Sequence, residues 1–215
     1  MKIRLLCIAI LVMLLIPMVC VGDGGYWYCP QCGRRNDGNY CPNDGTARPS
    51  DLAASAYSTP PTYYFSAHSL DFPHKLNCAV YTGPGTEYLR GANGTVQFIS
   101  QSFKYAGLDG DWLLVRCQVR GGGTRYGYID VSAYQQTVWG VQHLVFSDMR
   151  TVVSRDTKVW DSMMDEDLGP ICYLPQGTPV TYLCNFVIDG MNVAYIEVEY
   201  NYRLVRGFVY PSCLR

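Results

Sequence analysis

Three cysteines and one aspartate near the start of the chain stand at a spacing that could hold a metal ion. The segment YCPQCG contains Cys29 and Cys32, and the segment YCPNDG repeats it twelve residues later with Cys41 and Asp44. Two such turns facing one ion supply the four ligands that zinc prefers in structural sites, and a carboxylate can be one of them. The spacing predicts a zinc site that binds more weakly than a four-cysteine site, because a carboxylate is the harder ligand.

Two alternatives to this site stay open. The three cysteines could hold the metal with water or another residue, or Cys29 could form a disulfide with Cys32 or Cys41 and bind no metal. A redox role is disfavoured, because a thioredoxin-like Cys-x-x-Cys motif needs a βαβ setting that this sequence lacks. In each case the role is structural, since a segment of about 25 residues cannot build a core of its own.

The first residues have the pattern of a secretory signal peptide. Lys2 and Arg4 precede the uncharged apolar run Leu5–Val21, and small and acidic residues follow. We therefore predict a signal peptide over residues 1–22. The mature protein is expected to be secreted and extracellular, and association with the cell envelope is compatible with this. The run is slightly shorter than the ~20 apolar residues of a membrane span, so no membrane contact is expected after cleavage; a retained anchor is the alternative.

Composition narrows the remaining functions. The 215 residues have a formal net charge of −1 and no basic stripe, which argues against nucleic-acid binding. Tyrosine, glycine and β-branched residues are abundant and no segment has a helical period, so an all-β fold with tight turns is expected. The length suits one mid-sized domain or two small ones.

Residues 46–75 have the composition of a linker. Alanine, serine, threonine and proline dominate, and Pro60-Pro61 blocks regular structure. The run Tyr63-Tyr64-Phe65 is unusual for a solvated tether, so docking on a neighbouring sheet is an alternative for that part.

Hairpin patterns dominate the rest of the chain. Residues 112–119 alternate in polarity and are joined by a glycine turn to residues 125–129. A second alternation covers residues 180–186, and residues 194–198 are expected to pair with 205–209 across a turn at Asn201-Tyr202. The stretches 109–132 and 189–212 share an Asp-Gly turn, a strand, a hairpin loop and a closing strand, which indicates an internal duplication of a small β unit.

The first copy resembles the bacterial SH3-like (SH3b) domain over about residues 76–132. The resemblance rests on AVYTGPGTEY (79–88), GDWLLV (110–115) and GYI (127–129). The second copy lacks the Gly-Pro-Gly loop, which WDSMMDED (160–167) replaces, and keeps RGFV (206–209). The opening stretch is similar to the zinc ribbon that precedes such repeats in some secreted bacterial proteins, although Asp44 departs from the pattern.

The resemblance implies a domain order and a binding function. It implies a zinc-ribbon-like module (23–45), a linker (46–75) and two small SH3-like barrels in tandem (76–135 and, divergent, 145–215). Such barrels bind peptides on aromatic shelves. It thus implies cell-wall (peptidoglycan peptide) binding in a groove lined by Tyr81, Tyr88, Trp112, Tyr126 and Tyr128. For Trp112 and some of these tyrosines, a place in the barrel core is the alternative.

Nothing in the sequence predicts an enzyme. Neither His68, His74 nor His143 accompanies a nucleophile motif. The acidic cluster Asp161, Asp165, Glu166 and Asp167 lacks the pattern of a calcium loop and is expected to be solvated. The later cysteines could be buried thiols or form disulfides, for which Cys78–Cys117 and Cys172–Cys213 are candidate pairs. We predict a non-enzymatic secreted binding protein whose partner is peptidoglycan; the alternative is an extracellular protein–protein interaction scaffold.

Overall fold

The computed structural model describes residues 27–29, 35–36, 40–46, 59–72, 79–89, 102–118, 123–162 and 165–215. The predicted signal peptide, Cys32, His74 and Cys78 lie outside these residues. In the described part the secondary structure is strands, turns and two 3₁₀ turns, which confirms the all-β prediction. None of these residues belongs to a helix long and apolar enough to span a bilayer.

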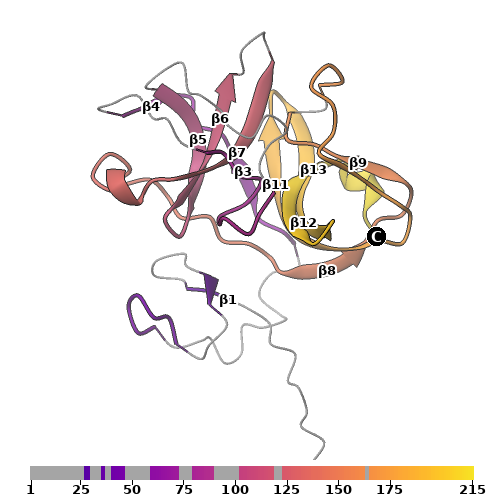
Figure 1. The fold of residues 1–215 in the computed structure, drawn as a ribbon, viewed down its shortest axis with the longest axis horizontal. Coiled ribbons are helices and arrows are strands. Elements are labelled where there is room, and N and C mark those ends of the chain that lie inside the picture. The colour runs from indigo at the N-terminus through magenta and orange to yellow at the C-terminus, as the bar shows by residue number, and fades with distance from the viewer. Residues whose placement is uncertain are drawn as a thin grey trace, which may run out of the picture.

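The first β unit is a four-stranded antiparallel sheet (Figure 1). In pairing order its strands are β4 (Leu70–Asp71), β5 (Ser102–Asp109), β6 (Trp112–Gln118) and β7 (Thr124–Asp130). The β5–β6 turn places Gly110 at a φ of +60°, a conformation that glycine adopts without steric cost. The predicted hairpin of residues 112–119 with 125–129 is formed by β6 and β7. The 3₁₀ turn η1 (Ser132–Tyr134) follows β7.

The second β unit repeats this order. Its strands are β8 (Met149–Val152), β11 (Pro179–Ile188), β12 (Met191–Tyr200) and β13 (Arg203–Val209), and the 3₁₀ turn η2 (Pro211–Cys213) follows them. Strands β11, β12 and β13 form an antiparallel meander, and β8 pairs with β11. The predicted pairing of residues 194–198 with 205–209 is confirmed. Both Asn201 and Tyr202 have positive φ, as a two-residue hairpin turn requires.

Two short strand pairs complete the structure. Strand β9 (Thr157–Val159) pairs with β10 (Cys172–Leu174) at the far side of the second unit, near the carboxyl end of the chain (Figure 1). Strand β1 (Trp27–Tyr28) pairs with β2 (Arg35–Asn36) in the amino-terminal module.

Matching residue bridges support the predicted duplication. In the first unit Tyr81 forms an antiparallel bridge to Tyr128 on β7. In the second unit Trp160 forms the same kind of bridge to Phe208 on β13. The two bridged strands are the last in their sheets, so Tyr81 and Trp160 occupy corresponding places.

The glycine before each bridged strand residue is required by the same contact. A Cβ atom on Gly127 would lie 2.4 Å from the Val80 side chain and 2.8 Å from the Tyr81 carbonyl oxygen. On Gly207 it would lie 2.5 Å from Val159 and 2.8 Å from the carbonyl oxygen of the next residue. Both positions therefore need a residue without a side chain, which places the two glycines in equivalent environments.

In the two β units the buried hydrophobic side chains of the described residues form three groups. One group fills the junction between the units; its members include Ala106, Leu114, Tyr126 and Tyr128 from the first and Leu183, Phe186, Tyr195 and Phe208 from the second. A second group belongs to the first unit and contains Leu113, Val115 and Cys117, the face predicted from the alternation of β6. The third lies within the second unit. Several strands serve two groups, because successive side chains of a strand point to opposite faces of its sheet.

Part of the predicted linker belongs to the folded body. Strand β3 (Thr62–Tyr64) pairs in parallel with β11, and the Ser66 amide donates a hydrogen bond to the Tyr105 carbonyl of the first unit. The Phe65 ring packs on Tyr126 and on Phe186, at centroid distances of 4.9 and 5.5 Å. Residues 59–72 are therefore not a free tether, because their aromatic side chains are needed to fill the junction.

The sheets do not close into the two barrels that the sequence predicts. Instead, a loop of each unit covers the last strand of the other: the Tyr126 amide on β7 donates to the Asp161 carbonyl, and the Leu89 amide donates to the Leu204 carbonyl on β13. The two sheets accordingly lie side by side (Figure 1). An edge strand covered in this way has its backbone groups satisfied without closure of its own sheet.

Candidate functional site

The aromatic residues of the predicted groove lie mainly inside the molecule. Tyr88, Tyr126 and Tyr128 are 0%, 3% and 0% exposed. Tyr81 and Trp112 are half-buried and pack edge to face, with ring centroids 5.6 Å apart. In this structure the second unit covers the three buried tyrosines, so they line no open groove. They are core residues, which is the alternative that the sequence left open for some of these tyrosines. Burial raises the pKa of Tyr126 to about 12, so its phenol stays neutral.

A buried arginine joins the two units. The Arg206 guanidinium is fully buried; its Nε donates to Glu197 Oε2 at 2.7 Å and its Nη1 to Asp109 Oδ2 of the first unit at 2.7 Å. The Tyr88 hydroxyl donates to the same Glu197 oxygen at 2.6 Å. The guanidinium carbon lies 4.9 Å from the ring centroid of Phe146. A charged group that is buried away from water needs oppositely charged or hydrogen-bonding partners. Because the partners of Arg206 come from both units, these contacts hold the two units together.

A second ionic contact crosses the junction in the opposite direction. Asp161, which follows Trp160, is buried and accepts a hydrogen bond from Arg125 Nη1 at 2.5 Å. Arg125 Nη2 also donates to the Leu168 carbonyl at 2.9 Å. Asp161 is therefore not part of a solvated acidic loop as predicted, whereas Glu166 and Asp167 of that loop are exposed. Burial raises the pKa of Asp161, and Arg125 partly opposes this shift.

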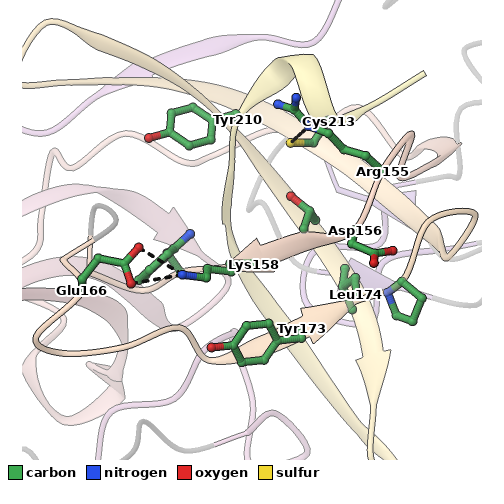
Figure 2. Close-up of a pocket in the computed structure, with 11 residues that line it drawn as sticks. Arg155, Asp156, Lys158, Glu166, Tyr173, Leu174, Tyr210 and Cys213 are labelled. Atoms are coloured by element: carbon green, nitrogen blue, oxygen red, sulfur yellow. Dashed lines mark hydrogen bonds and ion pairs between the residues drawn. The ribbon is translucent and has the colours of Figure 1, made fainter.

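The second unit carries an open pocket between β9, β10 and η2. Its volume is about 610 Å³, in the range of ligand sites. It is lined by Arg155, Asp156, Thr157, Lys158, Trp160, Glu166, Tyr173, Leu174, Pro175, Tyr210 and Cys213. Figure 2 shows Tyr210 and Tyr173 on opposite sides of the Lys158–Glu166 pair. Tyr210 and Tyr173 are 47% and 60% exposed, so both can contact a ligand.

The charged groups of this pocket differ in their partners. Lys158 Nζ donates to both oxygens of Glu166 at 3.1 Å and lies 5.2 Å from the Trp160 ring centroid. Arg155 donates through Nε to Cys213 Sγ at 3.4 Å and through Nη2 to Ser212 Oγ at 3.1 Å. Among the described residues no carboxylate pairs with Arg155. One cation of the pocket is thus already neutralised, and the other has only neutral partners.

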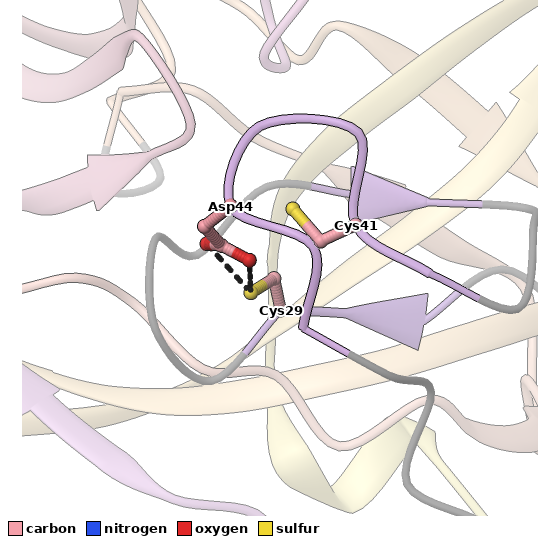
Figure 3. A group of neighbouring side chains, drawn as sticks. All are labelled: Cys29, Cys41 and Asp44. Atoms are coloured by element: carbon pink, nitrogen blue, oxygen red, sulfur yellow. Dashed lines mark hydrogen bonds between the residues drawn. The ribbon is translucent and has the colours of Figure 1, made fainter.

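A second candidate site lies in the amino-terminal module. Ligand atoms of Cys29, Cys41 and Asp44 all lie within 4.8 Å of one another (Figure 3). Cys29 Sγ is 3.2 and 3.5 Å from the two Asp44 oxygens. Around tetrahedral zinc, with bonds of about 2.3 Å to sulfur and about 2.0 Å to oxygen, a sulfur and an oxygen ligand are about 3.5 Å apart. The group could therefore hold a metal ion.

Local hydrogen bonds position the second half of this group. The Cys41 amide donates to the Thr46 carbonyl at 2.7 Å and the Gly45 amide to the Cys41 carbonyl at 2.9 Å. The Thr46 amide binds Asp44 Oδ1 at 2.9 Å, which points the carboxylate toward the cysteines. Gly45 has a φ of +72°, which closes the turn. Cys32 lies outside the described residues, so its part in the site stays a prediction.

The described thiols and histidines form no catalytic arrangement. Burial raises the pKa of Cys172 to about 12 and also raises that of Cys184, so neither thiol becomes a thiolate near neutral pH. Cys172 and Cys213 do not form the disulfide considered from the sequence. His68 and His143 are exposed, and no described contact joins either to a thiol.

Sequence reasoning missed the pocket because its residues come from four separate segments. Residues 155–160, Glu166, residues 173–175 and residues 210–213 meet only after β9 pairs with β10 and η2 folds back. A usable signal was the correspondence of Trp160 with Tyr81, which marks the region after β9 as the counterpart of the Gly-Pro-Gly loop. The predicted groove was placed on the first unit alone.

Comparison with known proteins gave no match to a family model, to a curated protein or to a solved structure.

Proposed function

We propose that this chain is a secreted, non-enzymatic binding protein whose SH3-like units engage peptide material of the bacterial cell wall. The pocket of the second unit carries this proposal. It offers two accessible tyrosines, an apolar floor of Trp160 and Leu174, and charged groups at its rim. Aromatic shelves with a few polar groups suit extended peptides, whose backbone and small side chains stack on the rings.

Co-sedimentation with purified peptidoglycan sacculi tests the proposal. Wild-type protein should pellet, and the double variant Tyr173→Ala/Tyr210→Ala should stay in solution because both shelves are lost. Tyr202→Ala is the matched control: Tyr202 is 97% exposed on the β12–β13 turn, outside the pocket, and its removal should leave pelleting unchanged. Circular dichroism verifies that all variants fold.

Other outcomes would change the proposal in defined ways. If wild type pellets and both variants pellet equally, the wall-binding surface lies elsewhere on the molecule. If wild type fails to pellet with several sacculus types, wall binding is wrong, and an extracellular partner protein becomes the better assignment.

The amino-terminal module would serve this function as a zinc-stabilised element. We propose that Cys29, Cys32, Cys41 and Asp44 bind one zinc ion, which holds together a segment too short for a core. The protein purified under reducing conditions should contain about one zinc per chain, measured by elemental analysis. Asp44→Cys should hold zinc at chelator concentrations that strip the wild type, since thiolate is the softer ligand. A metal-free wild type, even after zinc is added, would contradict the site.

A further inference from the structure

We propose that the pocket between β9, β10 and η2 binds the free carboxylate end of a short peptide, and that Arg155 is the group that receives the carboxylate. This inference rests on the proposed function and names the chemistry of its ligand. It starts from the one cation in the pocket that has no anionic partner among the described residues.

Arg155 is held in place by weak, neutral acceptors. Its Nε donates to Cys213 Sγ at 3.4 Å and its Nη2 to Ser212 Oγ at 3.1 Å, and both acceptors belong to η2 (Figure 2 shows the first contact). A guanidinium has five N–H donors, so these two bonds leave donors for a ligand. Arginine and carboxylate groups form paired hydrogen bonds with matching geometry, which makes a carboxylate the preferred partner.

The other charges of the pocket select against more highly charged anions. Lys158 is already neutralised by Glu166, with both contacts at 3.1 Å. Asp156 lies next to Arg155 in the chain and accepts a hydrogen bond from the Gln176 amide at 2.8 Å. With Glu166 paired to Lys158, Asp156 is the acidic side chain left at the rim, and it opposes a phosphate with two negative charges more than a single carboxylate. A single carboxylate is tolerated, and an amide or ammonium group of the same ligand would be favoured beside Asp156.

The apolar side chains of the pocket would contact the remainder of the peptide. Tyr173 and Tyr210 are accessible, while Trp160 and Leu174, which also line the pocket, are buried. A volume of about 610 Å³ accommodates a few amino-acid residues. A short peptide that ends in small residues could place its carboxylate on Arg155 and its backbone between the two tyrosines.

Saturation-transfer NMR with two peptide pools tests this inference. One pool contains acetylated tripeptides ending in L-Ala or D-Ala with a free carboxylate, and the other contains the same peptides as carboxamides. The carboxylate pool should bind wild-type protein roughly tenfold more tightly, because a charge-assisted hydrogen-bonded pair is lost in the amide. Arg155→Gln should bind both pools equally and weakly. Arg150→Gln removes the same charge from an exposed site on β8 and should keep the preference.

The outcomes separate this inference from the proposed function. Equal binding of the two pools by wild type, no binding of the carboxylate pool, or an unchanged preference in Arg155→Gln would each overturn the carboxylate site. If such a protein still pellets with sacculi, wall binding stands and Arg155 has no part in it. If the wild type prefers the carboxylate pool but does not pellet with sacculi, the carboxylate site is supported and wall binding is wrong.

Discussion

Tyr81 of the first unit and Trp160 of the second have corresponding positions, each bridged to the last strand of its sheet. The loops that follow them differ. The first loop ends in Tyr88, which the second unit buries completely. The second loop begins with Asp161, buried against the first unit, but continues to Glu166, which stays exposed beside Lys158. Of two loops in corresponding positions, the first thus contributes Tyr88 to the junction, and the second contributes to the junction and to a pocket.

The two units also differ in the residue that precedes the equivalent glycines, Gly127 and Gly207. Tyr126 precedes Gly127 and packs against Phe65 and Phe208, whereas Arg206 precedes Gly207 and holds two carboxylates. The residue before the glycine is therefore a packed ring in the first unit and a buried cation in the second, although an ion pair, Arg125–Asp161, also lies beside Tyr126. Removal of one partner from a buried ionic group is far more costly than loss of an exposed contact.

The largest expected effect comes from Arg206. Arg206→Ala would leave Asp109 and Glu197 buried without this cation, which should lower the free energy of unfolding by about 3–5 kcal/mol. Urea denaturation followed by tryptophan fluorescence measures the change. Arg203→Ala, on the same strand but exposed, should change stability by less than about 0.5 kcal/mol. Similar losses in the two variants would show that the ionic cluster does not hold the units together.

The equivalence of the two units can be tested at their glycines. Gly127→Ala and Gly207→Ala each force a Cβ atom to within 2.4 and 2.5 Å of a valine side chain. Because the contacts match, each substitution should destabilise the protein by about 1–3 kcal/mol, and the two losses should be similar. Gly140→Ala is the comparison without a clash: its Cβ meets open space, so any loss there comes from its φ of +81° alone. A large loss at only one of the two sites would break the proposed correspondence.

Local patterns predicted the strands better than the way in which they pack. The Asp-Gly turns and the pairing of 194–198 with 205–209 follow from turn chemistry and alternation within a few residues. The burial of Tyr88 depends on Glu197, which is 109 residues away, and no local pattern encodes that contact. Alternation identifies the two faces of a strand but cannot tell which of them a second unit will cover.

The candidate sites divide in the same way. Cys41 and Asp44 share one turn, so their spacing alone placed them near each other, and Cys29 joins them through a repeat of that turn. The pocket needs Arg155, Tyr173 and Tyr210, which come together only through the tertiary fold. Sites built within a turn are readable from sequence, whereas sites built between segments depend on the packing that sequence patterns leave undetermined.

A smaller effect is expected at Tyr88. Tyr88→Phe removes the hydroxyl that donates to Glu197 at 2.6 Å but keeps the ring, and Arg206 still binds the carboxylate. The free energy of unfolding should fall by about 1.5 kcal/mol, the value of one hydrogen bond to a charged group. Tyr173→Phe, at an exposed ring, should have no measurable effect. If Tyr88→Phe leaves stability unchanged but weakens pelleting with sacculi, Tyr88 belongs to a ligand site after all.

The smallest effect concerns the opposite side of the junction and depends on pH. Burial raises the pKa of Asp161 above its usual value of 3.8, although Arg125 lowers it in part, so the folded state holds this proton more tightly than the unfolded state. The contribution of Asp161 to stability is therefore greatest below pH 3.8 and falls as pH rises through the folded-state pKa. Asp161→Asn lacks this titration, and the stability of wild type relative to the variant should decline between about pH 3.5 and about pH 6. Urea unfolding at both pH values measures the difference, with Asp167→Asn as the exposed-carboxylate control. A relative stability that instead rises with pH would mean that Arg125 outweighs burial, so that the ionised Asp161 stabilises the folded state.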